Sequence, residues 1–264
     1  MNDRAPLSPP DDAPPVPDST SLGARMLNVF ATPADVFDEV KVSPPRTAHW
    51  LVPTRLATLV GWVGVWLVLH QESIKQQISD LQEAQLEKSI EQGRMTREQL
   101  EAQRPTIEKI GRIIRNATMF AAPPLMAFGL VFWWALITFL VGRYALGGHF
   151  TYMKAVEVSG LIGMLATLES VIKTLMMVAL GSLYAGANLA TLLVKDFDPA
   201  NLSHGLMAAV DVVAFWVLAV RAIGLSRLSG ATFAKSAAWL FGLWLLWTGL
   251  WIVAGHFLPK LFGG

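Results

Sequence analysis

ATMFAAPPLMAFGLVFWWALITFLV, residues 117–141, decides the fold, because it runs for 25 residues without a charged side chain. A helix rises about 1.5 Å per residue, so this segment is long enough to cross the roughly 30 Å hydrocarbon layer of a bilayer. Four more predominantly apolar stretches of similar length are expected to do the same: residues 50–70, 156–180, 204–225 and 235–257. The sequence predicts an all-α, integral membrane helical bundle of about five transmembrane helices.

The composition agrees with a membrane protein and argues against several other classes. Apolar residues make up 53% of the chain and charged residues only 16%, which is too apolar for an ordinary soluble domain. The net charge of +1 provides no broad field to attract nucleic acid, so we expect no nucleic-acid partner and a lipid bilayer as the main surroundings. Cysteine is absent, which removes disulfides, thiolate nucleophiles and cysteine-based metal sites.

The N-terminal part divides into a tail and a segment that precedes the membrane. Residues 1–20 are rich in Pro and Asp, predict a disordered tail and lack the pattern of a cleavable signal, so the first span is expected to act as the targeting anchor. Residues 21–48 carry two short apolar stripes separated at Pro33, with Thr32 as a possible N-cap. They predict amphipathic helices that lie on the membrane surface or dock against the chain's own spans.

A charged insertion over residues 71–116 separates the first two spans. It holds eight acidic and eight basic residues, and apolar residues recur at roughly helical spacing, which predicts a soluble helical hairpin. Gly93 is expected to form the turn, and residues 96–99 are expected to form a capping box that starts a second helix. Pro105 is expected to start a third helix that runs toward the next span. We interpret its charges as a solvated face rather than as a catalytic group.

The span count depends on an apolar run from Ala155 to Val194. As one helix it would be about 60 Å long, so it must bend, break or extend beyond the bilayer. Gly181, Gly186 and Asn188 mark the expected break, after which a re-entrant, interfacial or short helix follows. Five spans are expected, and six would place the C-terminus on the opposite side. The Pro123–Pro124 pair predicts a kink or a late helix start in the second span.

The candidate intramembrane polar residues are Glu169, Lys173, Asp211 and Arg221. Glu169 and Lys173 are one turn apart and could pair on one helix face. A charge near the middle of a bilayer costs on the order of 2.5 to 3.5 kcal/mol, so packing, a polar pathway or partner binding is expected to explain them. Asp211, about 9 Å into its span, could clamp neighbouring helices, meet Lys173 or meet a half-exposed helix terminus.

No signature of catalysis or cofactor binding accompanies these residues. The chain has no nucleophile elbow, phosphate-binding loop or zinc motif, and its histidines lie at span borders without ligand spacing. We expect no enzyme activity, no cofactor and no metal.

Several short segments, taken in order, resemble the Yip-one family of Ypt/Rab-interacting membrane proteins, in a bacterial-type form. The resemblance extends over about residues 28–257 and covers a segment before the first span, a glycine-rich connection and a pattern in the fourth span. The residues that carry it are Phe30, Pro33, Phe37, Gly147, Gly148, Asp211, Trp216 and Gly224. Val213, where relatives often carry Phe, and the charges in the third span depart from the family pattern.

The resemblance implies a five-span bundle in the bacterial inner membrane, with a cytosolic N-terminus and a non-catalytic role in membrane organisation or trafficking-like interactions. The leading hypothesis is a scaffold or adaptor that contacts a protein partner, or another copy of itself, through its N-terminal segment and charged insertion. The alternative is a small transporter or channel in which Glu169, Lys173 and Asp211 line a polar route. An intramembrane enzyme ranks last. Orientation rests on the resemblance, because Lys and Arg number nine on one side and ten on the other.

Overall fold

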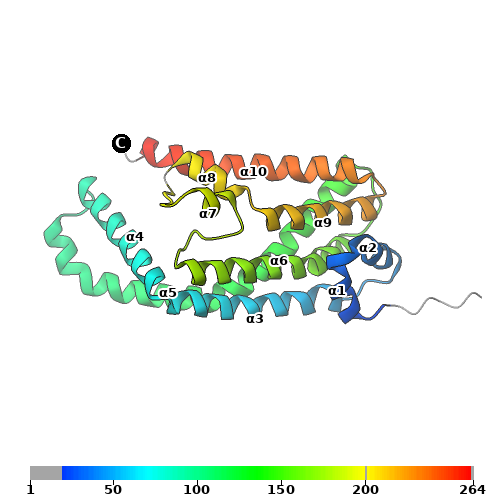
Figure 1. The fold of residues 1–264 in the computed structure, drawn as a ribbon, viewed down its shortest axis with the longest axis horizontal. Helices are drawn as coiled ribbons and strands as arrows, with labels where there is room; N and C mark the ends of the chain where they lie inside the picture. The colour runs from blue at the N-terminus through cyan, green and yellow to red at the C-terminus, as the bar shows by residue number, and fades with distance from the viewer. Residues whose placement is uncertain (1–19, 200, 263–264) are drawn as a thin grey trace, which may run out of the picture.

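The computed structural model describes residues 20–199 and 201–262, with side chains up to Phe257. The predicted tail over residues 1–20 therefore lies outside the described residues except for Thr20. Helices make up most of the described part, and no strand occurs in it (Figure 1). In chain order the elements are α1 (Leu22–Ala31), α2 (Pro33–Val42), α3 (Ala48–His70), α4 (Glu72–Glu91), α5 (Arg97–Leu140), the π-helical turn η1 (Val141–Ala145), α6 (Tyr152–Leu180), α7 (Leu189–Leu193), α8 (Leu202–Ala209), α9 (Val212–Ser229) and α10 (Phe233–Phe262).

Five of the described helices are long and apolar enough to cross a membrane: α3, α5 with η1, α6, α9 and α10. Their outer faces expose large apolar side chains, among them Leu245 at 66% and Trp251 at 62%. Such a surface would be costly in water but matches lipid tails. The predicted all-α membrane bundle with five spans is confirmed.

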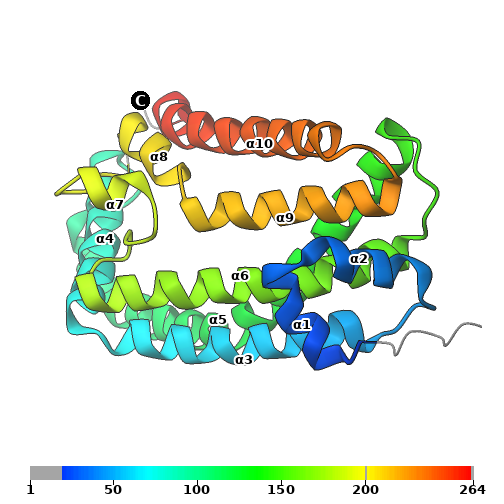
Figure 2. The ribbon, with the colours of Figure 1, turned by 45° about the vertical axis from the view of Figure 1, so that its right-hand side comes forward.

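The bundle has two distinct ends (Figure 2). In this view α9 and α10 lie antiparallel along one side, α3 lies along the other, and α6 runs between them. The long α5 crosses behind α6, from the α3 side to the end where α9 meets α10. The short helices α1 and α2 cover one end, and α4, α7 and α8 lie at the other. Because α3 links these two ends, the N-terminal helices and the charged insertion lie on opposite sides of a membrane.

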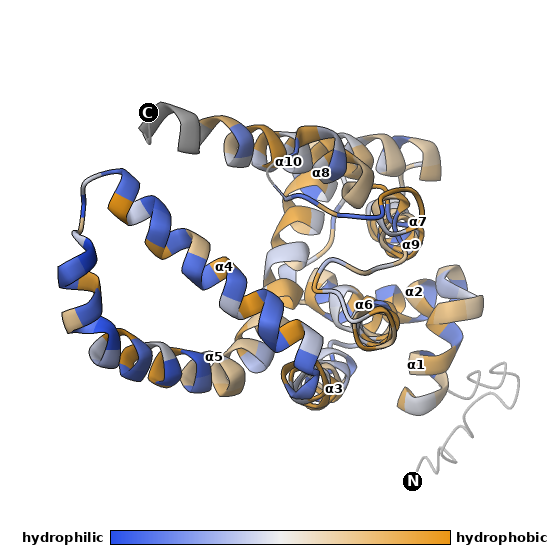
Figure 3. Cartoon of the chain, turned by 60° about the vertical axis from the view of Figure 1, so that its left-hand side comes forward, coloured by the Kyte–Doolittle hydropathy of each residue, from blue (hydrophilic) through white to orange (hydrophobic). Residues whose placement is uncertain are grey.

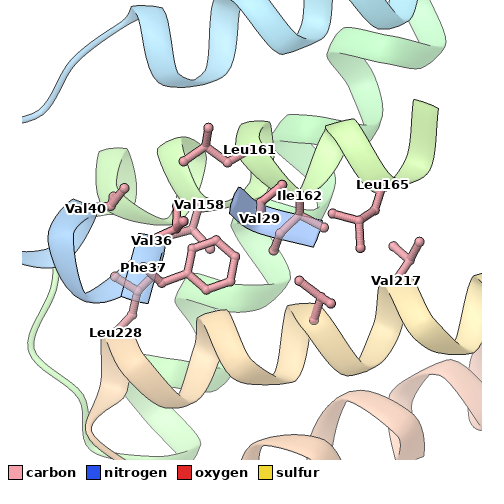
Figure 4. Packing of buried hydrophobic residues seen from close by; sticks show 11 residues of the cluster. Val29, Val36, Phe37, Val40, Val158, Leu161, Ile162, Leu165, Val217 and Leu228 are labelled. Carbon is pink, nitrogen blue, oxygen red and sulfur yellow. The ribbon is translucent and has the colours of Figure 1, made fainter. Parts of the chain in front are cut away.

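The N-terminal helices dock onto the chain's own spans. The largest buried cluster joins Val29 of α1 and Phe37 of α2 to Ile162 of α6 and Val217 of α9 (Figure 4). Phe37 has no exposed surface. The sequence left open whether these helices lie on the membrane surface or dock against the spans, and in the structure they dock against the spans.

The charged insertion is helical, but its boundaries differ from the prediction. Gly93 has φ +67°, and Thr96 and Gln99 form the predicted capping box at the start of α5. The predicted helix start at Pro105 is wrong, because α5 continues from Arg97 through this proline and through Pro123–Pro124 to Leu140. A proline removes one backbone donor, and the many remaining hydrogen bonds of a 44-residue helix maintain it.

The long apolar run breaks at the predicted glycine. Gly181 ends α6 in the left-handed conformation, with φ +60°. The following α7 has five residues, too few to cross a bilayer. The fourth span was predicted to begin at residue 204, which is wrong: it begins at Val212, and residues 202–209 form the separate helix α8. Backbone hydrogen bonds between the loop before α7 and the residues around Asp211 hold this interruption in place.

Candidate functional site

Asp211 lies at the start of a span rather than inside it. Its Oδ1 accepts hydrogen bonds from the backbone N–H groups of Val213 at 2.9 Å and Ala214 at 3.0 Å. This is N-cap geometry, which satisfies donors that the first turn of a helix leaves free. The predicted position about 9 Å inside the span is wrong because α9 begins one residue after Asp211.

Arg221 is buried in the bundle against an aromatic ring. Its side chain lies in the contact between α9 and α5, where its guanidinium carbon is 4.4 Å from the ring centre of Trp134. This distance defines a cation–π contact. The Nη1 atom has no hydrogen-bond partner among the described residues. The contact that positions the Arg221 guanidinium is the one with the Trp134 ring.

Glu169 and Lys173 do not form the predicted ion pair, since no contact within 4.0 Å joins them in the described part of the chain. Glu169 is half-buried and lies in the electrostatic field of Asp211 and Arg221 as well as of Lys173. Lys173 is exposed and lines a groove between α3, α5 and α6 whose lining includes neither acid. Within this groove, Lys173 is thus the only one of the three residues of the predicted polar route.

The residues that carry the family resemblance gather where α9 meets the rest of the bundle. Phe30 of α1 lies beside Trp216 of α9, with ring centres 6.1 Å apart. Phe37 of α2 faces Gly224 of α9, where a Cβ atom would come within 2.7 Å of Val158. A side chain at position 224 would thus push α9 away from α6.

The other resemblance residues shape turns and close contacts at the same end. Pro33 is the first residue of α2, after Thr32. Gly147 has φ +68°, a conformation that favours glycine. A Cβ atom on Gly148 would lie 2.6 Å from the Cα atom of Ser229. All these positions serve packing and chain direction.

A buried charge network at the N-terminal end was missed by the sequence analysis. We call it the N-terminal clamp; it consists of Arg25, Glu39, His49, Lys154 and Glu157. Arg25 Nε lies 3.1 Å from Glu39 Oε2, and Arg25 Nη1 lies 2.9 Å from His49 Nε2. His49 Nδ1 lies 2.8 Å from Glu157 Oε1, and Lys154 Nζ lies 2.9 Å from Glu157 Oε2. Except for Glu39, these side chains are buried.

The geometry of the N-terminal clamp fixes the state of its histidine. A guanidinium group only donates hydrogen bonds, so His49 Nε2 must accept from Arg25. The imidazole is then neutral, with its proton on Nδ1 donated to Glu157. Two cations, Arg25 and Lys154, balance two carboxylates, Glu39 and Glu157. The balanced charges fasten α1 and α2 to the starts of α3 and α6.

One sequence signal could have revealed the N-terminal clamp. Lys154 and Glu157 stand three residues apart at the start of an apolar helix, a spacing at which opposite charges are neighbours. Arg25 and His49 gave no such signal, because they are 24 residues apart and meet only when α1 docks.

The charged insertion forms a hairpin arm, which we define as α4 together with residues 97–116 of α5. The arm extends from the bundle, and its hydrophilic colouring contrasts with that of the spans (Figure 3). Its base is fixed: Ile74 is fully buried, and Gln77 Nε2 donates to the carbonyl of Gly181 at 2.6 Å. Farther out, exposed ion pairs such as Arg104 with Glu83, at 3.8 Å, join the two helices.

Five apolar spans with a polar helical arm define the class of the protein as a multi-pass membrane protein. No group of three or more His, Cys, Asp or Glu side chains suited to a metal ion occurs within residues 20–199 and 201–262. Comparison of the chain with protein-family models, curated proteins and solved structures gave no match. The resemblance to the Yip-one family therefore stays a prediction.

Proposed function

We propose that the protein is a non-catalytic scaffold or adaptor with a Yip-one-like membrane domain, and that its hairpin arm binds a protein partner. The observation that carries the proposal is the arm itself. Ordering its residues costs on the order of 1–2 kcal/mol each in backbone entropy, and the arm buries little apolar surface in return. A fixed base with a charged, water-exposed outer part is typical of a recognition element on a rigid support.

The N-terminal segment is a weaker candidate for partner binding than its sequence indicated. Phe37 is fully buried and Phe30 half-buried within the chain's own core. A partner that used these rings would have to displace α1 and α2 and open the N-terminal clamp. We therefore assign partner binding to the arm, and we expect changes at Phe30 and Phe37 to weaken folding first.

The proposal includes an orientation in the bacterial inner membrane. With a cytosolic N-terminus, the hairpin arm and the C-terminus face the periplasm. Reporter fusions after Gly230, in the turn between α9 and α10, and after Gly264 test this orientation. Cytosolic activity at Gly230 and periplasmic activity at Gly264 are expected; the reverse pattern overturns the orientation.

Site-specific photo-cross-linking in native membranes tests the partner. A photoreactive residue replaces Glu87 or Glu98, both exposed on the arm, in the full-length chain. We expect a discrete cross-linked product from both positions, whose mass separates a second copy of this chain from a different protein. The matched control is exposed Thr232 at the opposite end, from which that product should be missing. Lack of any product from the arm, or the same product from Thr232, contradicts the proposal.

A further inference from the structure

A groove on the side of the bundle runs between α3, α5 and α6 below the base of the hairpin arm. Its volume is about 630 Å³, within the range of ligand pockets in proteins. At its deep end α3 lies close to α5 and α6. A Cβ atom on Gly61 would come within 3.0 Å of Pro123, and one on Gly64 within 3.0 Å of Thr174. The remaining walls are mostly aliphatic, with Val65 and Met126 among them. Such walls suit a hydrocarbon chain.

The charged side chains that line this groove all have the same sign. They are Arg115 of α5 and Lys173 of α6, and no carboxylate lines the groove. Both cations are exposed, and neither has an ion-pair partner within 4.0 Å in residues 20–199 and 201–262. A cation inside a span is costly unless water or an anion compensates it. The groove thus offers two positive charges beside an apolar channel.

The depth of these cations matches the boundary between lipid tails and headgroups. Lys173 lies seven residues before the end of α6 at Leu180, about 10 Å along the helix axis. The long side chain of Lys173 can extend toward the headgroup level at the end of the bundle that carries the hairpin arm. Arg115 lies where α5 passes from its charged arm into its apolar span.

The polar end of the groove continues into a cleft of the hairpin arm. Gln82 and Arg115 line both the groove and the neighbouring cleft between α4 and α5. The cleft also contains the carboxylates of Glu72, Asp80 and Glu83, so a negative group is favoured at the mouth of the groove, beside Arg115 and Lys173, and not farther into the cleft. The occupant that fits is an amphiphile with an apolar part among the spans and an anionic head at the groove mouth.

We propose that this groove is a binding site for one phospholipid with a net negative headgroup, drawn from the surrounding bilayer. An acyl chain lies along the wall formed by α3 and α5, and the phosphate lies between Lys173 and Arg115. The two cations select an anionic lipid over a zwitterionic one, in which a choline cation would meet them. The site does not depend on a protein partner of the arm.

Native mass spectrometry of the detergent-purified full-length chain tests the proposal. The protein is mixed with equal amounts of phosphatidylglycerol and phosphatidylcholine that have the same acyl chains. We expect a one-lipid adduct of phosphatidylglycerol to dominate. Lys173→Gln combined with Arg115→Gln should lower this adduct at least tenfold and remove the preference. Lys173→Arg with native Arg115 keeps both positive charges and should retain the preference for phosphatidylglycerol.

Two single variants separate this site from general attraction to the membrane. Lys109→Gln removes a positive charge from the arm away from the groove and should leave the adduct unchanged. Ser170→Phe places a ring in the groove from an exposed position and should lower binding of both lipids. Equal adducts for the two lipids, an adduct that survives loss of both cations, or equal losses in Lys109→Gln would each overturn the proposal.

Discussion

Replacing Glu157 by Gln is expected to release α1 and α2 from the bundle. Glu157 is fully buried, and its Oε1 accepts from His49 Nδ1 at 2.8 Å and from the backbone N–H of Arg46 at 2.7 Å. Its Oε2 lies 2.9 Å from Lys154 Nζ. Gln keeps the shape of the side chain but loses the negative charge. Arg25 and Lys154 then remain as buried cations balanced only by Glu39.

The expected size of the effect follows from the burial of this charge. Removing one partner of a buried ion pair typically costs about 3–5 kcal/mol, because the other charge is left uncompensated. The N-terminal clamp connects α1, α2, α3 and α6, so the cost falls on the docking of the N-terminal helices. Each 1.4 kcal/mol is a factor of ten, so the undocked population should rise by about two to three and a half orders of magnitude.

Cysteine labelling measures this population directly. The chain has no native cysteine, so Val36→Cys introduces a single thiol on α2 at a position that is 3% exposed. A water-soluble maleimide should label it slowly in the otherwise native chain and about a hundredfold faster, or more, with Glu157→Gln. The control is Asp38→Asn, which removes an ion pair with Arg227 that spans 3.2 Å between half-exposed side chains.

The control separates the buried charge of Glu157 on α6 from the surface charge of Asp38 on α2, the helix that carries the thiol. A surface ion pair contributes about 0–1 kcal/mol, so Asp38→Asn should change the labelling rate less than about fivefold. Equal rates in the Glu157 and Asp38 variants would refute the reasoning, because the N-terminal clamp would then contribute no more than a surface pair.

Three further changes test the packing and the caps. Gly224→Ala should lower the free energy of unfolding by about 1–3 kcal/mol, because the new Cβ atom would overlap Val158. The control is Gly249→Ala, whose Cβ atom meets open space. Thermal unfolding in detergent compares the two variants. Asp211→Ala should cost about 0.5–2 kcal/mol through loss of the α9 N-cap, measured in the same way, and Asp211→Asn should retain most of that stability. Gly230→Ala, at φ +77°, should cost about 1–2 kcal/mol, and unchanged stability would contradict a strained turn.

The features that could be predicted from the sequence are local in the chain. The capping box of Thr96 and Gln99 lies within one helical turn, and the break at Gly181 follows from glycine's tolerance of left-handed backbone. The apolar lengths of the five spans are equally local, because a bilayer fixes the length that a helix needs. The start of the fourth span was misplaced because the residues before Asp211 are apolar enough to resemble a span while forming a separate helix.

The contacts between distant segments could not be predicted in the same way. Arg25, His49 and Glu157 meet only because α1 folds back onto α3 and α6, and nothing in their spacing indicates a shared site. The reverse error affected Glu169 and Lys173, whose spacing permits a pair that the structure does not form. Their side chains face different neighbours, since Lys173 lines the groove between α3, α5 and α6, and Glu169 lies in the electrostatic field of Arg221.

The charges that hold the fold together and the charges that remain exposed lie toward opposite ends of α6. The N-terminal clamp uses its charges in mutual contacts near the start of α6, whereas Lys173 and many charged side chains of the hairpin arm, toward the other end, are exposed to the surroundings. If recognition resides in the arm, Glu157→Gln should loosen α1 and α2 yet leave the cross-link from Glu98 intact. If the docking of α1 and α2 and the cross-link from Glu98 were lost together, the undocking of the N-terminal helices would change the arm through α6. The arm could then not be an independent binding element.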